Sequence, residues 1–137
     1  MTKPRRALFI PTYQSAQTVG ATLLKIPKEK AEEFGKIYVF DNRSTDQTVQ
    51  RVQDFVRANH WKNLQVYIND DNYELVGSTF LAVRQALADG FDELSYIDSH
   101  GAFLNLNLKT LDLKNLQPLD ATKNANQSMM SRRLEEI

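Results

Sequence analysis

The stretch that decides the fold reads Ala7-Leu8-Phe9-Ile10-Pro11-Thr12-Tyr13, an apolar run that leads directly into a polar and aromatic cluster. The pattern recurs three times along the chain. It is found at Ile37–Phe40 before Asp41-Asn42, at Leu64–Ile68 before Asn69-Asp70-Asp71, and at Leu94–Ile97 before Asp98-Ser99-His100. Continuous apolar runs of this length are typical of strands buried on both faces of a parallel sheet.

Amphipathic segments separate these runs. Apolar residues at helical spacing predict a helix from near Ser15 to the residue before Pro27, and another from about Ser78 to Asp89. Between them, Ser44 and Gln47 have the spacing of a capping box, which predicts that a helix begins there. Alternating strands and helices predict an α/β fold with three layers, α/β/α, around a mostly parallel sheet.

The carboxyl ends of parallel strands meet at one rim of a sheet, and ligands bind along that rim in open α/β folds. Tyr13, Asp41 and Asp98 each stand where a predicted strand ends. The pattern therefore predicts a site that contains these three side chains.

Composition limits the functional classes. The 137 residues favour one domain, and equal numbers of basic and acidic residues, 17 each, give no general attraction to nucleic acid or to an anionic membrane. The absence of cysteine excludes disulfides and thiolate chemistry. The apolar run after the basic N-terminus is too short for a signal peptide, so we expect a cytoplasmic protein, with a position at the inner face of a membrane left open.

The character of the chain changes after Gly101. We divide it into residues 1–101, which carry the strand and helix pattern, and residues 102–137, a divergent or truncated segment. Leu104, Leu106 and Leu108 alternate as in a strand, but residues 121–131 are polar and the charged end is expected to be a frayed helix or disordered.

Two motifs carry a family resemblance. The run Leu8–Gln14, followed by Val39–Asp46, resembles the start of family 2 glycosyltransferases of the GT-A fold, whose first two strands end in Pro-Thr-Tyr-Asn and Asp-Asn-Gly-Ser-Thr-Asp. Asn72, Gly77 and Asp98-Ser99-His100 stand where the family has an Asn, a Gly and an Asp-x-Asp motif. The resemblance covers about residues 6–101 and implies a Rossmann-like nucleotide-binding half with strand order 3-2-1-4.

The resemblance also implies a nucleotide-diphosphate sugar as donor and a divalent metal, Mn²⁺ or Mg²⁺. In the family, the first motif lines the base pocket, and the aspartate that ends the second strand binds the base. The positions that it assigns to the donor site are Pro11, Thr12, Tyr13, Asp41, Asn72, Gly77 and Asp98, and those assigned to the metal are Asp98 and His100.

Two positions depart from the family pattern. Arg43 replaces a small residue, and an arginine is strained if this position has a positive φ. His100 replaces the second acid of Asp-x-Asp, and an imidazole suits Mn²⁺ better than Mg²⁺. We therefore expect weak metal binding that depends on the phosphates of the nucleotide.

Two functional hypotheses follow. In one, the chain is a transferase that passes a sugar to an acceptor hydroxyl on a saccharide or a lipid-linked molecule, with an acceptor half that is missing or divergent. The alternative is a non-catalytic nucleotide-binding or interaction module derived from a truncated glycosyltransferase. No side chain is singled out as the catalytic base, and an exposed edge of the sheet predicts self-association.

Overall fold

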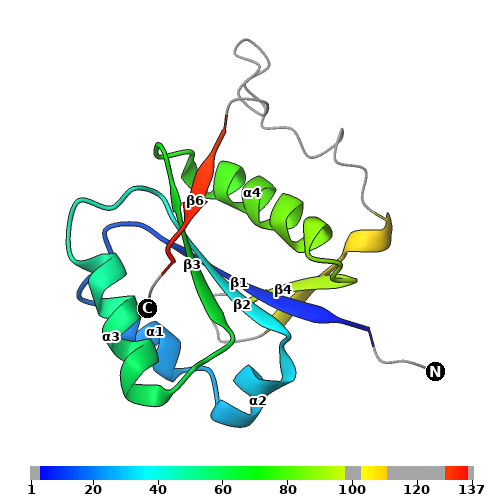
Figure 1. Ribbon diagram of the computed structural model, residues 1–137, viewed down its shortest axis with the longest axis horizontal. Helices are drawn as coiled ribbons and strands as arrows, with labels where there is room; N and C mark the ends of the chain where they lie inside the picture. Colours follow the sequence, from blue (N-terminus) through cyan, green and yellow to red (C-terminus); the bar gives the residue numbers. More distant parts are fainter. Residues whose placement is uncertain (1–3, 98–102, 111–128, 136–137) are drawn as a thin grey trace.

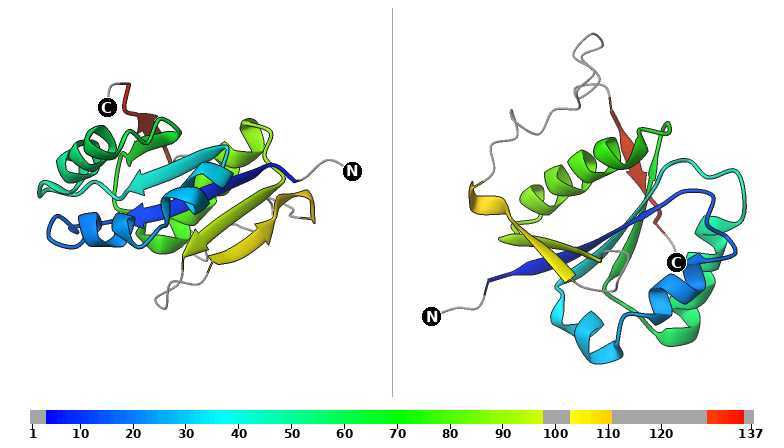
Figure 2. Two further views of the ribbon diagram at one scale, coloured as in Figure 1. Left: turned by 90° about the horizontal axis from the view of Figure 1, so that it is seen from below. Right: turned by 180° about the vertical axis from the view of Figure 1, so that it is seen from behind.

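The computed structural model describes residues 4–97, 103–110 and 129–135 (Figure 1). One sheet forms the centre of the molecule, and helices cover both of its faces (Figures 1 and 2). The strands are β1 Arg6–Thr12, β2 Lys36–Asp41, β3 Leu64–Asn69, β4 Glu93–Ile97, β5 Phe103–Asn107 and β6 Ser131–Arg133. The helices are α1 Val19–Leu24, α2 Lys28–Glu33, α3 Thr48–Asn59, α4 Glu74–Ala88 and the 3₁₀ turn η1 Leu108–Thr110.

The order of the strands in the sheet is β5-β4-β1-β2-β3-β6. The four inner strands are parallel and have the predicted order 3-2-1-4. The two outer strands are antiparallel to their neighbours. The α/β class is therefore confirmed, and the sheet is wider by one strand at each edge than the sequence predicted.

The buried side chains explain why the central strands form. Ala7, Leu8, Phe9 and Ile10 of β1 are each at most 5% exposed, because neighbouring side chains point to opposite faces and both faces are covered. One apolar cluster joins the face of the sheet under α4 to Leu108 and Met129. The other joins the opposite face to α1, α2 and α3.

The charged end of the chain is a strand, so the prediction of a frayed helix or disorder is wrong for Ser131–Arg133. This segment pairs with the outer edge of β3, and flanking bonds extend the pairing: Leu134 N–H donates to Val66 O at 2.8 Å, and Asp70 N–H donates to Met130 O at 2.9 Å. A three-residue strand has no periodicity of its own, so only the unpaired edge of β3 explains it.

Two helix starts also differ from the sequence analysis. Helix α4 begins at Glu74, four residues before the predicted start, because Leu75 and Val76 are exposed and so hide the apolar periodicity. Helix α1 begins at Val19, because Ser15 O accepts hydrogen bonds from the backbone of Thr18 and Val19 in a preceding turn.

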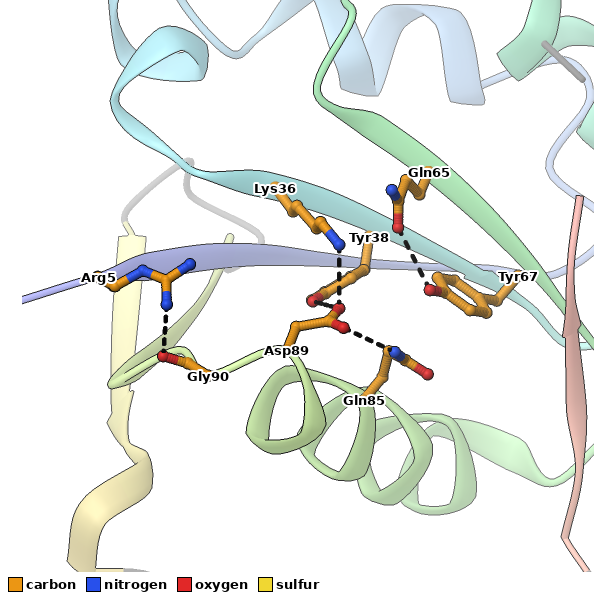
Figure 3. A network of polar contacts seen from close by, with 8 residues as sticks. All are labelled: Arg5, Lys36, Tyr38, Gln65, Tyr67, Gln85, Asp89 and Gly90. Carbon is orange, nitrogen blue, oxygen red and sulfur yellow. Dashed lines mark hydrogen bonds and ion pairs between the residues drawn. The ribbon is translucent and has the colours of Figure 1, made fainter. Parts of the chain in front are cut away.

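A polar cluster lies at the end of the sheet where the strands begin (Figure 3). The Tyr38 hydroxyl donates to the Asp89 carboxylate, which also accepts from Lys36 Nζ at 3.4 Å and from Gln85 Nε2 at 3.2 Å. Burial and the neighbouring Asp89 raise the pKa of Tyr38 far above its usual range. This cluster attaches the end of α4 to β2, on the side of the molecule away from the strand ends that carry the predicted site.

No helix within the described ranges is long and apolar enough to cross a membrane.

Candidate functional site

Three parallel strands end side by side at one rim of the sheet. Thr12 of β1 is in register with Asp41 of β2, and Asp41 is in register with Ile68 of β3. Thr12, Asp41 and Asn69 are each at most 5% exposed. The rim is thus a row of buried polar side chains, and Tyr13, which follows Thr12 directly, is half exposed beside it.

Asp41 holds the ends of β1 and β2 together. Its Oδ1 accepts hydrogen bonds from Thr12 Oγ1 and from Ser44 Oγ, both at 2.7 Å, and its Oδ2 accepts one from Ser44 N–H, also at 2.7 Å. The predicted capping box is therefore wrong, because the Ser44 hydroxyl is bound to Asp41. Helix α3 begins at Thr48 instead, and Gln47 at its N-cap makes no capping bond with its side chain.

Asp46 supplies the missing cap. Its Oδ1 accepts from Thr48 N–H at 3.0 Å and from the Thr48 hydroxyl, and its Oδ2 accepts from Ala16 N–H at 3.1 Å. The hydrogen bond from the Thr48 side chain and those from backbone N–H groups lower the pKa of Asp46, although desolvation opposes them. Asp46 thus has a structural role at the start of α3.

Gln14 connects the loop after β1 to the loop after β2. Its Oε1 accepts from Thr45 N–H at 2.6 Å, and its Nε2 donates to Thr45 Oγ1 at 3.0 Å. Gln14 N–H donates to Ser44 Oγ at 2.8 Å. Gln14 was not among the predicted site residues, and the only signal for it in the sequence is its place at the end of the first motif.

A second group of amides lies behind the rim. Asn69 Nδ2 donates to Asn42 Oδ1 at 2.7 Å and to Ser78 Oγ at 2.8 Å, and Asn42 Nδ2 donates to Glu74 O at 3.2 Å. Asn69 Oδ1 is buried and has no partner among the described residues. Asn42 and Asn69 were also not among the predicted site residues, although each stands at the end of an apolar run.

Asn72 and Gly77 shape the start of α4. Asn72 Oδ1 accepts from Glu74 N–H at 2.9 Å, which turns the loop into the helix. Gly77 is buried, and a Cβ on it would lie 2.3 Å from the Cβ of Tyr73. A glycine is thus required there by close packing. The pKa of Tyr73 is raised, first by burial and then by its hydrogen bond to Asp70.

Backbone strain gathers at the same rim. Gln14, Arg43 and Glu74 follow β1, β2 and β3, and their φ values are 48°, 61° and 61°. Residues with a side chain avoid this region, and strained residues cluster at functional sites. Strain at Arg43 was expected if this position had a positive φ, and its φ of 61° confirms that strain.

Two hollows open at the rim. One, of about 340 Å³, is lined by Pro11, Thr12, Tyr13, Asn42, Asn72, Glu74 and Leu75. The other, of about 680 Å³, is lined by Asp41, Arg43, Ser44, Asp46, Val49, Ile68, Asn69, Asp70, Met130, Ser131 and Arg132. Four of the predicted donor-site residues line the first hollow: Pro11, Thr12, Tyr13 and Asn72. Asp41 lines the second hollow. The hydrogen bond from Thr12 to Asp41 joins the two.

A comparison with protein families matches residues 7–111 to Glycosyl transferase family 2. The chain belongs to this family. The match includes the four parallel strands from Ala7 onward and the loops that follow β1, β2 and β3, but not Met130–Arg132, which also line the larger hollow. A comparison with curated proteins found no match.

Solved glycosyltransferases share the fold. The mannosyltransferase PcManGT from Pyrobaculum calidifontis, solved in complex with GDP-Man and Mn²⁺, gives a TM-score of 0.60 at 20% identity, over 71% of this chain and 28% of that one. S. aureus TarS 1-349 gives 0.54 at 26% identity, over 69% and 27%. Its complex with UDP-GlcNAc gives 0.53 at 26%, over 69% and 26%. The chain therefore spans little more than a quarter of the length of these structures.

The predicted metal ligands of this family 2 chain, Asp98 and His100, lie outside the described residues. Asp98 is also the third residue of the predicted rim. Within the described ranges, no group of three or more His, Asp or Glu side chains is placed to hold a metal ion. The donor chemistry of Asp98 and His100, one carboxylate oxygen and one imidazole nitrogen, fits Mn²⁺.

Proposed function

We propose that this chain binds a nucleotide-diphosphate sugar at the rim formed by the ends of β1, β2 and β3, as the donor half of a glycosyltransferase. The observation that carries the proposal is the position of Tyr13. Tyr13 is 50% exposed, in a hollow that it shares with Thr12 and Asn72. Thr12 in turn donates a hydrogen bond to the buried carboxylate of Asp41. The complex of TarS with UDP-GlcNAc, at 26% identity, supports the choice of ligand.

Each residue at the rim has a role that its contacts support. The exposed ring of Tyr13 offers a flat apolar surface on which a base stacks. Asp41 orients the strand ends through Thr12 and Ser44. A carboxylate has about four acceptor positions, so Asp41 Oδ2, which accepts Ser44 N–H, keeps capacity for an N–H of the base.

The diphosphate requires positive charge as the bond between sugar and phosphate breaks. A divalent cation supplies this charge in metal-dependent transferases, and Asp98 and His100 are the residues proposed to hold it. The residues described at the rim bind and orient the nucleotide, and we assign no catalytic base for the acceptor hydroxyl.

Titration calorimetry tests the proposal with UDP, UDP-GlcNAc and GDP in the presence of Mn²⁺. Tyr13→Ala should weaken binding of the preferred nucleotide by about 1–3 kcal/mol, the usual value of one base–aromatic stack. Leu24→Ala is the matched control, because Leu24 is 70% exposed on α1 and lies outside both hollows. It should bind as the wild type does.

Two outcomes would count against donor binding: a wild-type chain that binds none of the three nucleotides, or a Tyr13→Ala chain that binds as tightly as the wild type. Nucleotide binding without sugar transfer, measured with a labelled donor and a panel of saccharide and lipid-linked acceptors, would favour the alternative of a non-catalytic nucleotide-binding module.

A further inference from the structure

The two edges of the sheet differ in how they are protected. The edge strand β6 has three residues, and two of them, Arg132 and Arg133, are exposed and charged. Short length and charge are the usual means by which proteins prevent edge pairing. The other edge strand, β5, has five residues, Phe103–Asn107, without a charge, a proline or a glycine. The edge formed by β5 lacks this protection.

The hydrogen bonds around β5 show which of its backbone groups face outward. Leu108 N–H donates to Asp92 O at 2.8 Å, and Asp92 N–H donates to Arg5 O. The bond from Leu108 marks a hydrogen-bonding position just beyond the Glu93–Asn107 end of the β4–β5 ladder. Such positions alternate along antiparallel strands. The N–H and C=O groups of Phe103, Asn105 and Asn107 therefore point away from β4.

These outward groups meet no further strand of the described sheet, in which β5 is the last member (Figure 2). Side chains next to them are apolar and exposed. Leu104 is 41% exposed, and its register partner on β4, Tyr96, is 42% exposed. Backbone groups and apolar side chains thus offer one continuous surface for an added strand.

We propose that β5 pairs with β5 of a second copy of this chain, antiparallel, about a two-fold axis at Asn105. In this register Asn105 exchanges hydrogen bonds with Asn105 of the second copy. Phe103 lies opposite Asn107 of the second copy, whose C=O also accepts a hydrogen bond from Thr110 Oγ1 at 3.2 Å. Leu104 lies opposite Leu106 of the second copy, on the face of the sheet that carries α4.

The sequence of β5 favours a second copy of this chain as the source of the added strand. Under two-fold symmetry its two leucines meet, Leu104 against Leu106 of the second copy, and Asn105 meets Asn105. The strand carries no charge, so it neither repels its own copy nor selects a partner of opposite charge. The inference goes beyond the proposed function and does not depend on nucleotide binding.

Sedimentation equilibrium of the full chain over a range of micromolar concentrations tests the pairing. The wild type should form a dimer, and Asn105→Pro should raise its dissociation constant at least about tenfold, because proline removes an outward N–H and leaves the β4–β5 ladder intact. Asn105→Ala is the matched control. It loses the side-chain bond from Ser95 but keeps the backbone N–H, so it should dimerise as the wild type does.

A second variant keeps the test decisive if Asn105→Pro fails to fold. Leu104→Lys places a charge on an exposed position of the interface and should also raise the dissociation constant at least about tenfold. Met130→Lys, at an exposed position next to β6, should have no effect. A wild type that stays monomeric overturns the proposal, and so does a dimer that tolerates Leu104→Lys and any folded Asn105→Pro.

Discussion

At the scale of single residues, Arg43 shows most clearly that the backbone of the site is strained. It follows Asp41 with a φ of 61°, a conformation that costs residues with a Cβ about 1–2 kcal/mol. Its guanidinium Nη1 donates to Asp70 O at 2.8 Å, which ties the loop after β2 to the loop after β3. The residue thus combines a strained backbone with a stabilising side chain.

Two substitutions at Arg43 separate these effects. Arg43→Gly and Arg43→Ala both remove the bond to Asp70, but only glycine adopts a positive φ without strain. We expect the glycine variant to be more stable than the alanine variant by about 1 kcal/mol. Urea denaturation followed by circular dichroism measures the difference. Equal stabilities would mean that the backbone at this position is not strained.

At the scale of elements, Asp89 determines how the end of α4 attaches to the sheet. Its carboxylate, which has a side-chain exposure of 21%, accepts hydrogen bonds from Tyr38, Gln85 and Lys36 (Figure 3). Desolvation acts to raise the pKa of Asp89, but these hydrogen bonds and the charge of Lys36 outweigh it and lower the pKa below 3.8.

The lowered pKa of Asp89 gives a stability effect with a definite sign. The carboxylate stabilises the fold above its unfolded-state pKa of about 3.9, and this contribution is lost as the pH falls through the lower folded-state pKa. Asp89→Asn should therefore reduce the free energy of unfolding by about 1–2 kcal/mol at pH 7, and by less as the pH falls below about 4.

Urea denaturation at a series of pH values measures this difference. Asp54→Asn is the control, because the Asp54 side chain is 59% exposed and pairs on the surface with Arg57. Its effect should stay within about 0.5 kcal/mol. A deficit in Asp89→Asn that is as large at pH 3 as at pH 7 would contradict the assigned role of the charge.

At the scale of the whole molecule, residues from the end of the chain complete the core. Met129 is 2% exposed and belongs to the same apolar cluster as Phe9 and Tyr38, whereas its neighbour Met130 is 56% exposed. Leu134, on the other side of β6, packs against the opposite cluster. The residues that flank β6 therefore contribute to the apolar clusters on both faces of the sheet.

Two neighbouring methionines provide a matched test of this contribution. Met129→Ala should reduce the free energy of unfolding by about 2–5 kcal/mol, because it opens a cavity under α4. Met130→Ala should change it by less than about 0.5 kcal/mol. Thermal and urea denaturation of both variants measure the effect. Similar stabilities would mean that Met129 does not pack in the core under α4.

The sequence predicted what depends on local pattern. Apolar runs such as Ala7–Ile10 identified the buried strands, and the family motifs correctly predicted the order of the four parallel strands. Local pattern failed where a side chain had a distant partner. Ser44 had the spacing of a cap, but the carboxylate of Asp41 and the backbone of Gln14 bind its hydroxyl instead.

By itself the sequence determined the α/β class, the parallel strands and the rim on which Tyr13 and Asp41 stand, because burial and strand direction follow from hydrophobic pattern. Only the tertiary structure decided the rest: the pairing of β6 with β3, the amide group of Asn42 and Asn69, and the two hollows that separate Tyr13 from Asp41. The reason is physical. These features depend on hydrogen bonds between residues far apart in the chain, and each residue there offers several donors or acceptors that become committed only when the elements pack.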